Sequence, residues 1–316
     1  MSTEMLVILI VLAAVLLLFV GPVAVLSYIL YRILLVRTGP EKWGRECSLP
    51  EDEEYKRMFD IGIRWFENNK DTKHDVSIVS DGYRLAGEYF DFGYDKAVIV
   101  IPGRMESCIY SYYFAEPYVK AGYNVLAIDN RAHGLSEGRR CSLGYKEYRD
   151  IINWSKYLHD GENVNTVVLH GICIGASTAL FALTADDCPD YIKGMVAEGM
   201  YTTFAESFKN HMIVDKHPLF PIFYAAMLQV RLLSGANVVS DGPIKRIDRL
   251  TKPILFLHSK EDCFSLPDKA QLLYEKCTAP KTMEWFEVGS HSRIRINNTE
   301  KYDKAILKFV EETKNL

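Results

Sequence analysis

A cysteine framed by two glycines is the part of this sequence that points most directly to chemistry. Residues 171–175 read Gly-Ile-Cys-Ile-Gly, so Cys173 fills the nucleophile position of a Gly-x-nucleophile-x-Gly elbow. An elbow needs a strand before it and a helix after it, and the apolar run at 166–169 and the small residues at 176–183 suit those elements. The glycines permit a tight turn that exposes the nucleophile. The motif is short and recurs by chance, so its meaning depends on the rest of the chain.

An inert role for Cys173 is the alternative, because free cysteine often serves as a small buried residue. The chain has seven cysteines, an odd number without C-x-x-C spacing, which argues against a zinc knuckle or a disulfide framework and favours a reducing compartment. The net charge of −4 gives no electrostatic footprint for nucleic acid. We therefore expect no metal, no cofactor and no nucleic-acid partner.

The N-terminal segment 5–35 is almost continuously apolar. Its stretch 6–30 carries no charge and exceeds the roughly 20 residues that a helix needs to cross a bilayer. A cleaved signal peptide is the alternative, but the segment lacks a basic beginning and a clear cleavage motif, and it is longer than a signal core of about 7–15 residues. Basic residues lie at the C-terminal end of the segment and just beyond it, so the positive-inside rule predicts a single-pass membrane protein with its bulk in the cytoplasm. These residues are Arg32, Arg37, Lys42 and Arg45.

Eight short apolar runs predict the strands of one sheet, and longer segments between or after them predict helices. The first two runs flank an Asp-Gly turn typical of a hairpin, and the others alternate with helices. This order predicts an α/β fold, with a mostly parallel eight-stranded sheet, helices on both faces and chemistry beyond the carboxyl ends of the strands. The predicted strands are 76–79, 84–89, 97–101, 125–128, 167–169, 194–197, 254–257 and 283–286, and the predicted helices include 142–159, 174–185, 267–277 and 299–313.

Four further segments at the ends of predicted strands carry distinctive motifs. Residues 101–107 read Ile-Pro-Gly-Arg-Met-Glu-Ser, 129–138 read Asp-Asn-Arg-Ala-His-Gly-Leu-Ser-Glu-Gly, 257–262 read Leu-His-Ser-Lys-Glu-Asp and 289–292 read Gly-Ser-His-Ser. With the elbow, they resemble the α/β-hydrolases, closest to the monoacylglycerol-lipase and serine-aminopeptidase-like group. The second segment matches that group's D-x-R-G-H-G-x-S-x-G loop, with Ala132 in place of the usual glycine. The resemblance implies an α/β-hydrolase fold from about residue 76 onward.

The resemblance also implies a catalytic triad in the chain order nucleophile, acid, histidine. Here these residues would be Cys173, Asp262 and His291. His291 would take the proton from Cys173 and return it to the leaving group, while Asp262 would fix the imidazole tautomer and stabilise its cation. A cysteine beside a histidine at the start of a helix is expected to exist partly as thiolate. The histidines expected to have structural roles are His133, His170 and His258.

An oxyanion hole follows from the same resemblance, with the backbone N–H groups of Ile174 and Arg104 as donors. Residues 101–107 resemble the H-G-x-G-E-H segment of the family, but Pro102 replaces its first histidine. The side-chain support of this loop is therefore expected to differ, whereas the backbone donor at Arg104 is unaffected. The side chain of Arg104 is in a position to face a carboxylate of the substrate.

These features divide the chain into an anchor, a connector, a core and a cap. The cap segment 219–233 is strongly apolar but too short to span a bilayer. We expect it to form a lid helix that lines an acyl pocket, with plain packing against the core as a nearly equal alternative. The predicted limits are 1–37 for the anchor, 38–75 for the helical connector, 76–200 and 249–316 for the core, and 201–248 for the cap.

The leading hypothesis is a membrane-anchored, esterase-like hydrolase that cleaves a small-molecule ester or thioester through an acyl-Cys173 intermediate. Dienelactone hydrolases and the bile-acid acyltransferase group resemble this chain in having a cysteine at the elbow, so acyl transfer is a second hypothesis. A third is a non-catalytic binding or scaffold protein, because fold alone does not determine function. A catalytic Cys173 is expected to alkylate rapidly near neutral pH, and more slowly without His291. The sequence carries no signal for an oligomeric state.

Overall fold

The structure, a computed structural model, describes residues 2–313 and centres on one eight-stranded sheet. The strand order is β1-β2-β4-β3-β5-β6-β7-β8, with β2 antiparallel to both of its neighbours and all other pairs parallel. Each predicted strand lies within one observed strand, so the predicted mostly parallel sheet is confirmed. The strands are β1 Lys73–Ser80, β2 Tyr83–Phe90, β3 Lys96–Ile101, β4 Asn124–Ile128, β5 Thr166–Ile172, β6 Ile192–Glu198, β7 Ile254–Ser259 and β8 Lys281–Phe286.

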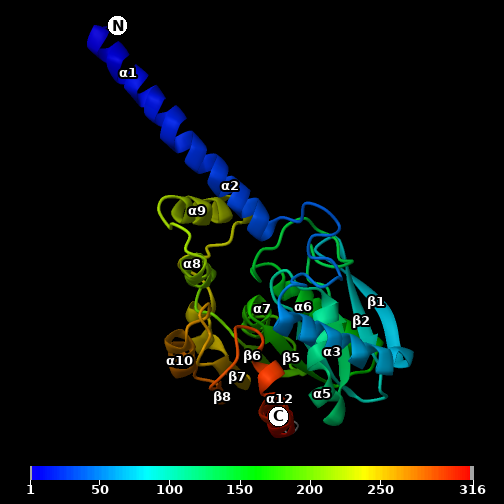
Figure 1. The fold of residues 1–316 in the computed structure, drawn as a ribbon. Helices are drawn as coiled ribbons and strands as arrows, with labels where there is room; N and C mark the ends of the chain where they lie inside the picture. Colours follow the sequence, from blue (N-terminus) through cyan, green and yellow to red (C-terminus); the bar gives the residue numbers. More distant parts are fainter. Residues whose placement is uncertain (1, 314–316) are drawn as a thin grey trace.

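Helices cover both faces of this sheet (Figure 1). On one face, Trp154, Leu180 and Leu273 pack against the strands, and on the other face Trp65 and Ile306 do so. The central strands are apolar almost throughout because both of their faces are covered. The helices of the first face are α6 Tyr148–Lys156, α7 Ile174–Leu183 and α10 Pro267–Lys276, and those of the second are α3 Glu53–Asn69, α5 Glu116–Lys120 and α12 Thr299–Thr313.

The predicted helix at 142–159 is wrong at its beginning. The chain there first forms a loop in which Leu143 and Gly144 have positive φ angles of 59° and 90°. The carboxylate of Glu147 accepts hydrogen bonds from the N–H groups of Ser142 and Gly144, at 2.6 and 2.9 Å. This side chain satisfies backbone donors that a helix would otherwise use, and α6 starts only at Tyr148.

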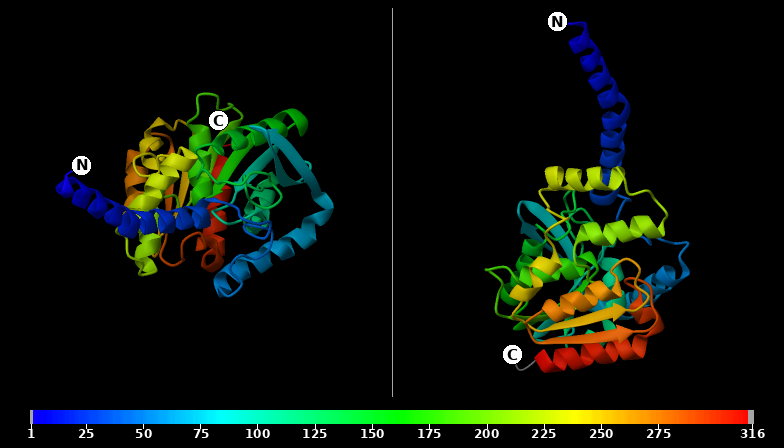
Figure 2. Two further views of the ribbon diagram at one scale, coloured as in Figure 1. Left: turned by 90° about the horizontal axis from the view of Figure 1, so that it is seen from above. Right: turned by 90° about the vertical axis from the view of Figure 1, so that its left-hand side faces the viewer.

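The N-terminal segment is one continuous helix, composed of α1 Thr3–Val15, a wider turn at Leu16–Val20 and α2 Gly21–Leu35. It is long and apolar enough to cross a membrane, and it projects away from the domain (Figures 1 and 2). Its last turns belong to the domain, because Tyr31, Leu34 and Leu35 are buried in an apolar cluster. The carbonyl oxygen of Leu35 also accepts a hydrogen bond of 2.9 Å from the N–H of Cys141.

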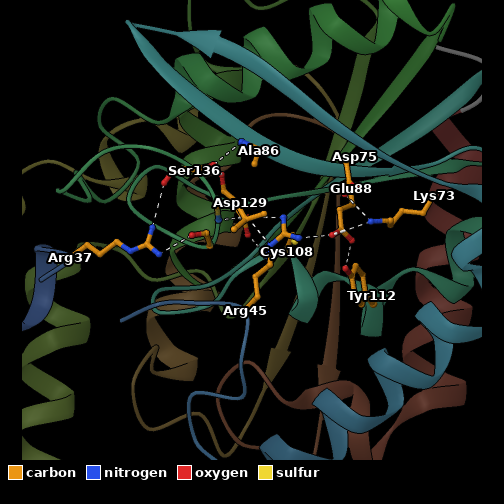
Figure 3. A network of polar contacts seen from close by, with 12 residues as sticks. Arg37, Arg45, Lys73, Asp75, Ala86, Glu88, Cys108, Tyr112, Asp129 and Ser136 are labelled. Carbon is orange, nitrogen blue, oxygen red and sulfur yellow. Dashed lines mark hydrogen bonds and ion pairs between the residues drawn. The ribbon is translucent and has the colours of Figure 1, made fainter. Parts of the chain in front are cut away.

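The basic residues after this helix have partners inside the protein. The guanidinium of Arg45 lies between Glu88 and Asp129, at 2.5 and 2.9 Å, and that of Arg37 donates to carbonyl oxygens of the 129–138 loop (Figure 3). The ammonium of Lys42 donates to three carbonyl oxygens at the end of α2. These cations therefore fix the connector to the domain, in addition to any influence on membrane topology.

The predicted cap segment, between β6 and β7, forms α8 Phe204–Val214, α9 Ile222–Ser234 and two short 3₁₀ turns. In Figure 2, α9 crosses beside the lower part of the long N-terminal helix. Gln229 fixes this contact, because its amide donates to the carbonyl oxygen of Ala24 at 2.9 Å and to the hydroxyl of Ser27 at 2.6 Å. The segment and the base of the N-terminal helix thus pack together as one side of the molecule.

Candidate active site

Cys173 lies in the sharp turn between β5 and α7, as the elbow motif predicts. Its φ and ψ angles are 53° and −109°, a strained conformation for a residue with a side chain. Its N–H donates to the carbonyl oxygen of Glu198 at 2.8 Å, which holds the turn against β6. A Cβ atom on Gly171 would overlap the backbone of α7, and one on Gly175 would overlap the carbonyl oxygen of Ile101. Both glycines are therefore required by close backbone approach.

The structure brings His291 and Asp262 together from two separate loops. Nδ1 of His291 lies 2.7 Å from Oδ2 of Asp262. The other carboxylate oxygen accepts hydrogen bonds from the N–H groups of Phe264 and Ser265, at 2.9 and 2.8 Å. Burial raises the pKa of Asp262, but His291 and these N–H donors outweigh that effect and hold it below its usual value. Asp262 is therefore an ionised and fixed partner for the imidazole.

Cys173 is the neighbour of the His291 imidazole on the side away from Asp262. Burial lowers the pKa of His291, but Asp262 and Cys173 together raise it well above its usual value. Nε2 of His291 is buried and has no fully formed hydrogen bond within residues 2–313. This nitrogen is therefore free to exchange a proton with the thiol or with a bound substrate. The three residues of the predicted triad thus lie side by side.

Two aromatic residues that the sequence gave no reason to select complete the surroundings of His291. Phe264 contacts the imidazole edge to face, with ring centroids 5.6 Å apart, and His211 of α8 stacks on Phe264 at 3.5 Å. Burial and the charge of His291 lower the pKa of His211 to about 3, so His211 is neutral at physiological pH. No motif marks either residue, because their contact joins loops distant in the sequence.

The predicted oxyanion donors, the backbone N–H groups of Arg104 and Ile174, are both without a hydrogen-bond acceptor in the part of the chain that the structure describes. Glu106 supports the loop that carries Arg104, because its carboxylate accepts from the N–H of Gly103 at 2.8 Å and from the hydroxyl of Tyr55 at 3.3 Å. Glu106 thus supplies side-chain support to a loop in which proline replaces the family's histidine, a role that its place in the motif did not reveal.

A cleft of about 860 Å³ lies between the N-terminal helix, the connector and the cap segment, and Arg104 and His211 are among the residues that line it. Leu30 and Ile33 of α2 form one wall, and Phe208 and Met212 of α8 form another. Of the predicted lid segment 219–233, Ile222 is the residue that lines this cleft. The buried face of α9 packs into an apolar cluster instead, through Phe223, Met227 and Val230.

The other histidines that were considered have structural surroundings. His133 stacks on Trp43 with centroids 4.6 Å apart, and burial lowers its pKa to about 4. His170 lies 3.1 Å from the hydroxyl of Tyr302, and burial lowers its pKa to about 3. Nε2 of His258 is 2.7 Å from the carbonyl oxygen of Ser265. None of them faces the cleft.

The sheet order, the elbow and the histidine–carboxylate pair are arranged as in the α/β-hydrolase fold, and this is the fold of the chain. A family model described as serine aminopeptidase, S33 matches residues 94–214, from the approach to β3 through the elbow to the end of α8.

Individual proteins are also similar to this chain. The chain is 27% identical over 267 residues to the uncharacterized protein YqkD of Bacillus subtilis (strain 168), covering 83% of this chain and 87% of YqkD. Among solved structures, the esterase Pf2001 of Pyrococcus furiosus is 24% identical with a TM-score of 0.67, covering 78% of this chain and 94% of that one. An esterase from Exiguobacterium antarcticum is 16% identical with a TM-score of 0.56, covering 75% and 100%. These two structures are similar to this chain in fold.

Proposed function

We propose that the protein is a membrane-anchored hydrolase that cleaves an ester or thioester through an acyl-Cys173 intermediate. The observation that carries this proposal is the Asp262–His291 pair, placed beside a cysteine in the strained elbow position. An inert buried cysteine would not need a strained elbow, an ionised carboxylate and an imidazole with a free nitrogen. The two solved esterases of the same fold agree with hydrolysis of an acyl ester.

The chemistry follows from the positions of these groups. His291 holds the proton of Cys173, and the thiolate attacks the acyl carbonyl carbon, whose oxygen becomes an oxyanion bound by the N–H groups of Arg104 and Ile174. The tetrahedral intermediate expels the alcohol or thiol, which takes the proton from Nε2, and leaves the acyl group on sulfur. A water then gives a proton to His291 and attacks the thioester, which releases the acid and restores the thiol.

Acyl transfer is a second candidate, favoured by the burial of the site. The side chain of His291 is only 9% exposed, and apolar side chains form two walls of the cleft. A site that restricts water lets an amine, alcohol or thiol compete for the acyl-cysteine. An acceptor added to the assay separates the two reactions, because transfer yields an acylated acceptor in place of the free acid.

The N-terminal helix is proposed as a retained membrane span, with the domain on the cytoplasmic side. Removal of the helix as a signal peptide would take away Leu35, which is fully buried in the domain. On α9, Tyr224, Leu228 and Leu232 are spaced four residues apart and are 59%, 57% and 71% exposed. This stripe lies on a helix that packs against α2, so it supports a bilayer surface at the level of α9.

The test uses the full chain in detergent, because the base of the N-terminal helix is part of the domain core. Hydrolysis of p-nitrophenyl butyrate and of a medium-chain acyl thioester is compared for wild type, Cys173→Ala and His291→Ala. Both variants are expected to lose turnover, whereas Cys188→Ala, a control beyond the opposite end of the sheet, is expected to retain it. In wild type, mass spectrometry is expected to find the acyl group on Cys173.

Absence of turnover would favour the third hypothesis, a non-catalytic binding or scaffold protein. No turnover by wild type, with Cys173 alkylated no faster than Cys188 at pH 7, would mean a non-catalytic binding protein.

A further inference from the structure

Arg104 differs from the other arginines in the interior of the domain. Arg45 pairs with Glu88 and Asp129, Arg131 with Asp81 and Asp150, and Arg295 with Asp303. The side chain of Arg104 forms no hydrogen bond and no ion pair among residues 2–313, although burial lowers its pKa. None of its titratable neighbours is a carboxylate; they are Cys173, Cys141, Tyr201, His211 and Lys42. Arg104 is half-buried, and an unpaired charge in a partly desolvated position is less favourable than one that has a partner.

The position of Arg104 shows where a compensating group would come from. The residue lines the cleft and is an electrostatic neighbour of Cys173, and its backbone N–H is one of the two proposed oxyanion donors. The only other lysine or arginine lining the cleft, Lys42, is already bonded to three carbonyl oxygens. The carboxylates that line the cleft are solvent-exposed and are not neighbours of Arg104; they are Glu41, Glu46 and Asp215.

We propose that Arg104 binds a carboxylate of the substrate, so that the substrate is an anionic acyl ester or thioester with an apolar portion. This inference rests on the proposed function and specifies its substrate class. The guanidinium and the oxyanion-donating N–H belong to the same residue. The bound anion would therefore lie no farther from the reacting carbonyl than about the length of an arginine side chain. The planar fork of arginine suits a carboxylate, which it can bind with two parallel hydrogen bonds. The apolar portion would lie along Leu30 and Ile33 of α2.

The experiment compares substrates that differ only by a terminal carboxylate, with the full chain in detergent. For an anion on the acyl side, the pair is p-nitrophenyl hexanoate and the p-nitrophenyl monoester of adipic acid. For an anion on the leaving group, the pair is the hexanoyl thioesters of propanethiol and of 3-mercaptopropionate. The readout is the ratio of kcat/KM for the charged and the neutral member of each pair.

Wild type is expected to prefer the charged member of one pair. In Arg104→Met that ratio is expected to fall roughly 10- to 100-fold, the range for a hydrogen bond to a charged group. In Arg104→Lys, which keeps the charge but loses the planar fork, the ratio is expected to lie between those of wild type and Arg104→Met. Arg149→Met, an exposed arginine of α6, is the control and is expected to leave the ratio unchanged.

Two results would overturn the inference while leaving the proposed function intact. One is turnover by wild type without preference for either charged substrate. The other is an equal loss for charged and neutral substrates in Arg104→Met, which would mean that Arg104 acts only on the Cys173 thiolate or the oxyanion.

A binding measurement covers the case in which wild type turns over none of the four substrates. The monoamide of adipic acid is then expected to slow alkylation of Cys173 by iodoacetamide in wild type but not in Arg104→Met. Equal alkylation rates with and without this compound in wild type would overturn the inference as well.

Discussion

At the scale of single residues, the charge of His291 depends on Asp262. Asp262 raises the pKa of His291, so the imidazolium persists at a higher pH than it would alone. Replacing Asp262 with asparagine removes that effect and allows either tautomer of the ring. The imidazolium is then lost at a lower pH, and less of it is present at pH 7 to stabilise a thiolate on Cys173.

Asp262→Asn is therefore expected to lower kcat/KM by roughly 1,000- to 10,000-fold, as removal of a triad carboxylate does. Alkylation of Cys173 by iodoacetamide is expected to be slower than in wild type at pH 7, because less imidazolium is present beside the sulfur. The measurement is the pH profile of alkylation for both proteins. Superimposable profiles would show that Asp262 does not act on His291.

The functional residues that could be predicted from the sequence are those whose motif lies within a few neighbouring positions. Cys173 was recognisable because two glycines and a strand–helix boundary surround it within a few positions. His211, Phe264 and Glu106 were not, because their roles depend on contacts between segments that are far apart in the chain, such as Tyr55 with Glu106 and Phe264 with His211. Arg104 was recognisable as a donor, but its lack of a partner is visible only once the neighbouring loops are in place.

At the scale of elements, the end of β6 carries a buried acid behind the elbow. Glu198 is fully buried, its main-chain oxygen holds Cys173, and its carboxylate accepts a hydrogen bond from the hydroxyl of Tyr302. Burial raises the pKa of Glu198 to about 7. The unfolded chain binds a proton at Glu198 less tightly, so ionisation of this residue opposes folding. The resulting loss of stability is absent below about pH 4.5 and complete above about pH 7.

Glu198→Gln keeps the acceptor for Tyr302 and removes the charge. Relative to wild type, this variant is expected to gain stability as the pH rises from 5 to 8, by on the order of 3 kcal/mol. The measurement is thermal or denaturant unfolding of both proteins at the two pH values, in the same detergent. The same difference in stability at both pH values would contradict the proposed titration of Glu198.

The exposed apolar stripe on α9 predicts that this helix contacts the bilayer surface. If α9 lies at the membrane surface, a tryptophan introduced as Leu232→Trp is expected to be quenched by brominated lipid in reconstituted vesicles. Val79→Trp, on β1 and also strongly exposed, is the matched control and is expected to be quenched much less. Fluorescence is measured relative to the unsubstituted chain. Equal quenching at the two positions would mean that α9 faces water.

At the scale of the whole molecule, the sheet was predictable and the attachment of the anchor was not. The strands are apolar runs whose lengths and spacing can be read locally, and they were found in full. The basic residues after the anchor were interpreted by their charge alone, whereas Arg45 bonds across the fold to Asp129. Ala132 also occupies a position with φ 65°, which explains why related loops have glycine there and shows that alanine is accommodated. Such non-local contacts leave no periodic signal in the sequence.

The anchor and the domain are therefore expected to behave as one folding unit. Leu35 is fully buried in the domain, whereas Leu17 is 76% exposed on the part of the helix that projects from it. Leu35→Ala is expected to destabilise the domain by about 2–5 kcal/mol, the cost of truncating a buried leucine. Leu17→Ala is expected to change stability by less than about 0.5 kcal/mol.

The measurement is unfolding of each full-length variant in detergent, followed by tryptophan fluorescence of the domain. A fragment that begins at residue 38 tests the same contacts more severely, because it lacks Tyr31, Leu34 and Leu35 together. We expect that fragment to be less stable than Leu35→Ala. A fragment as stable as the full chain would show that the domain is independent of the helix, and it would restore the signal-peptide interpretation of the N-terminal segment.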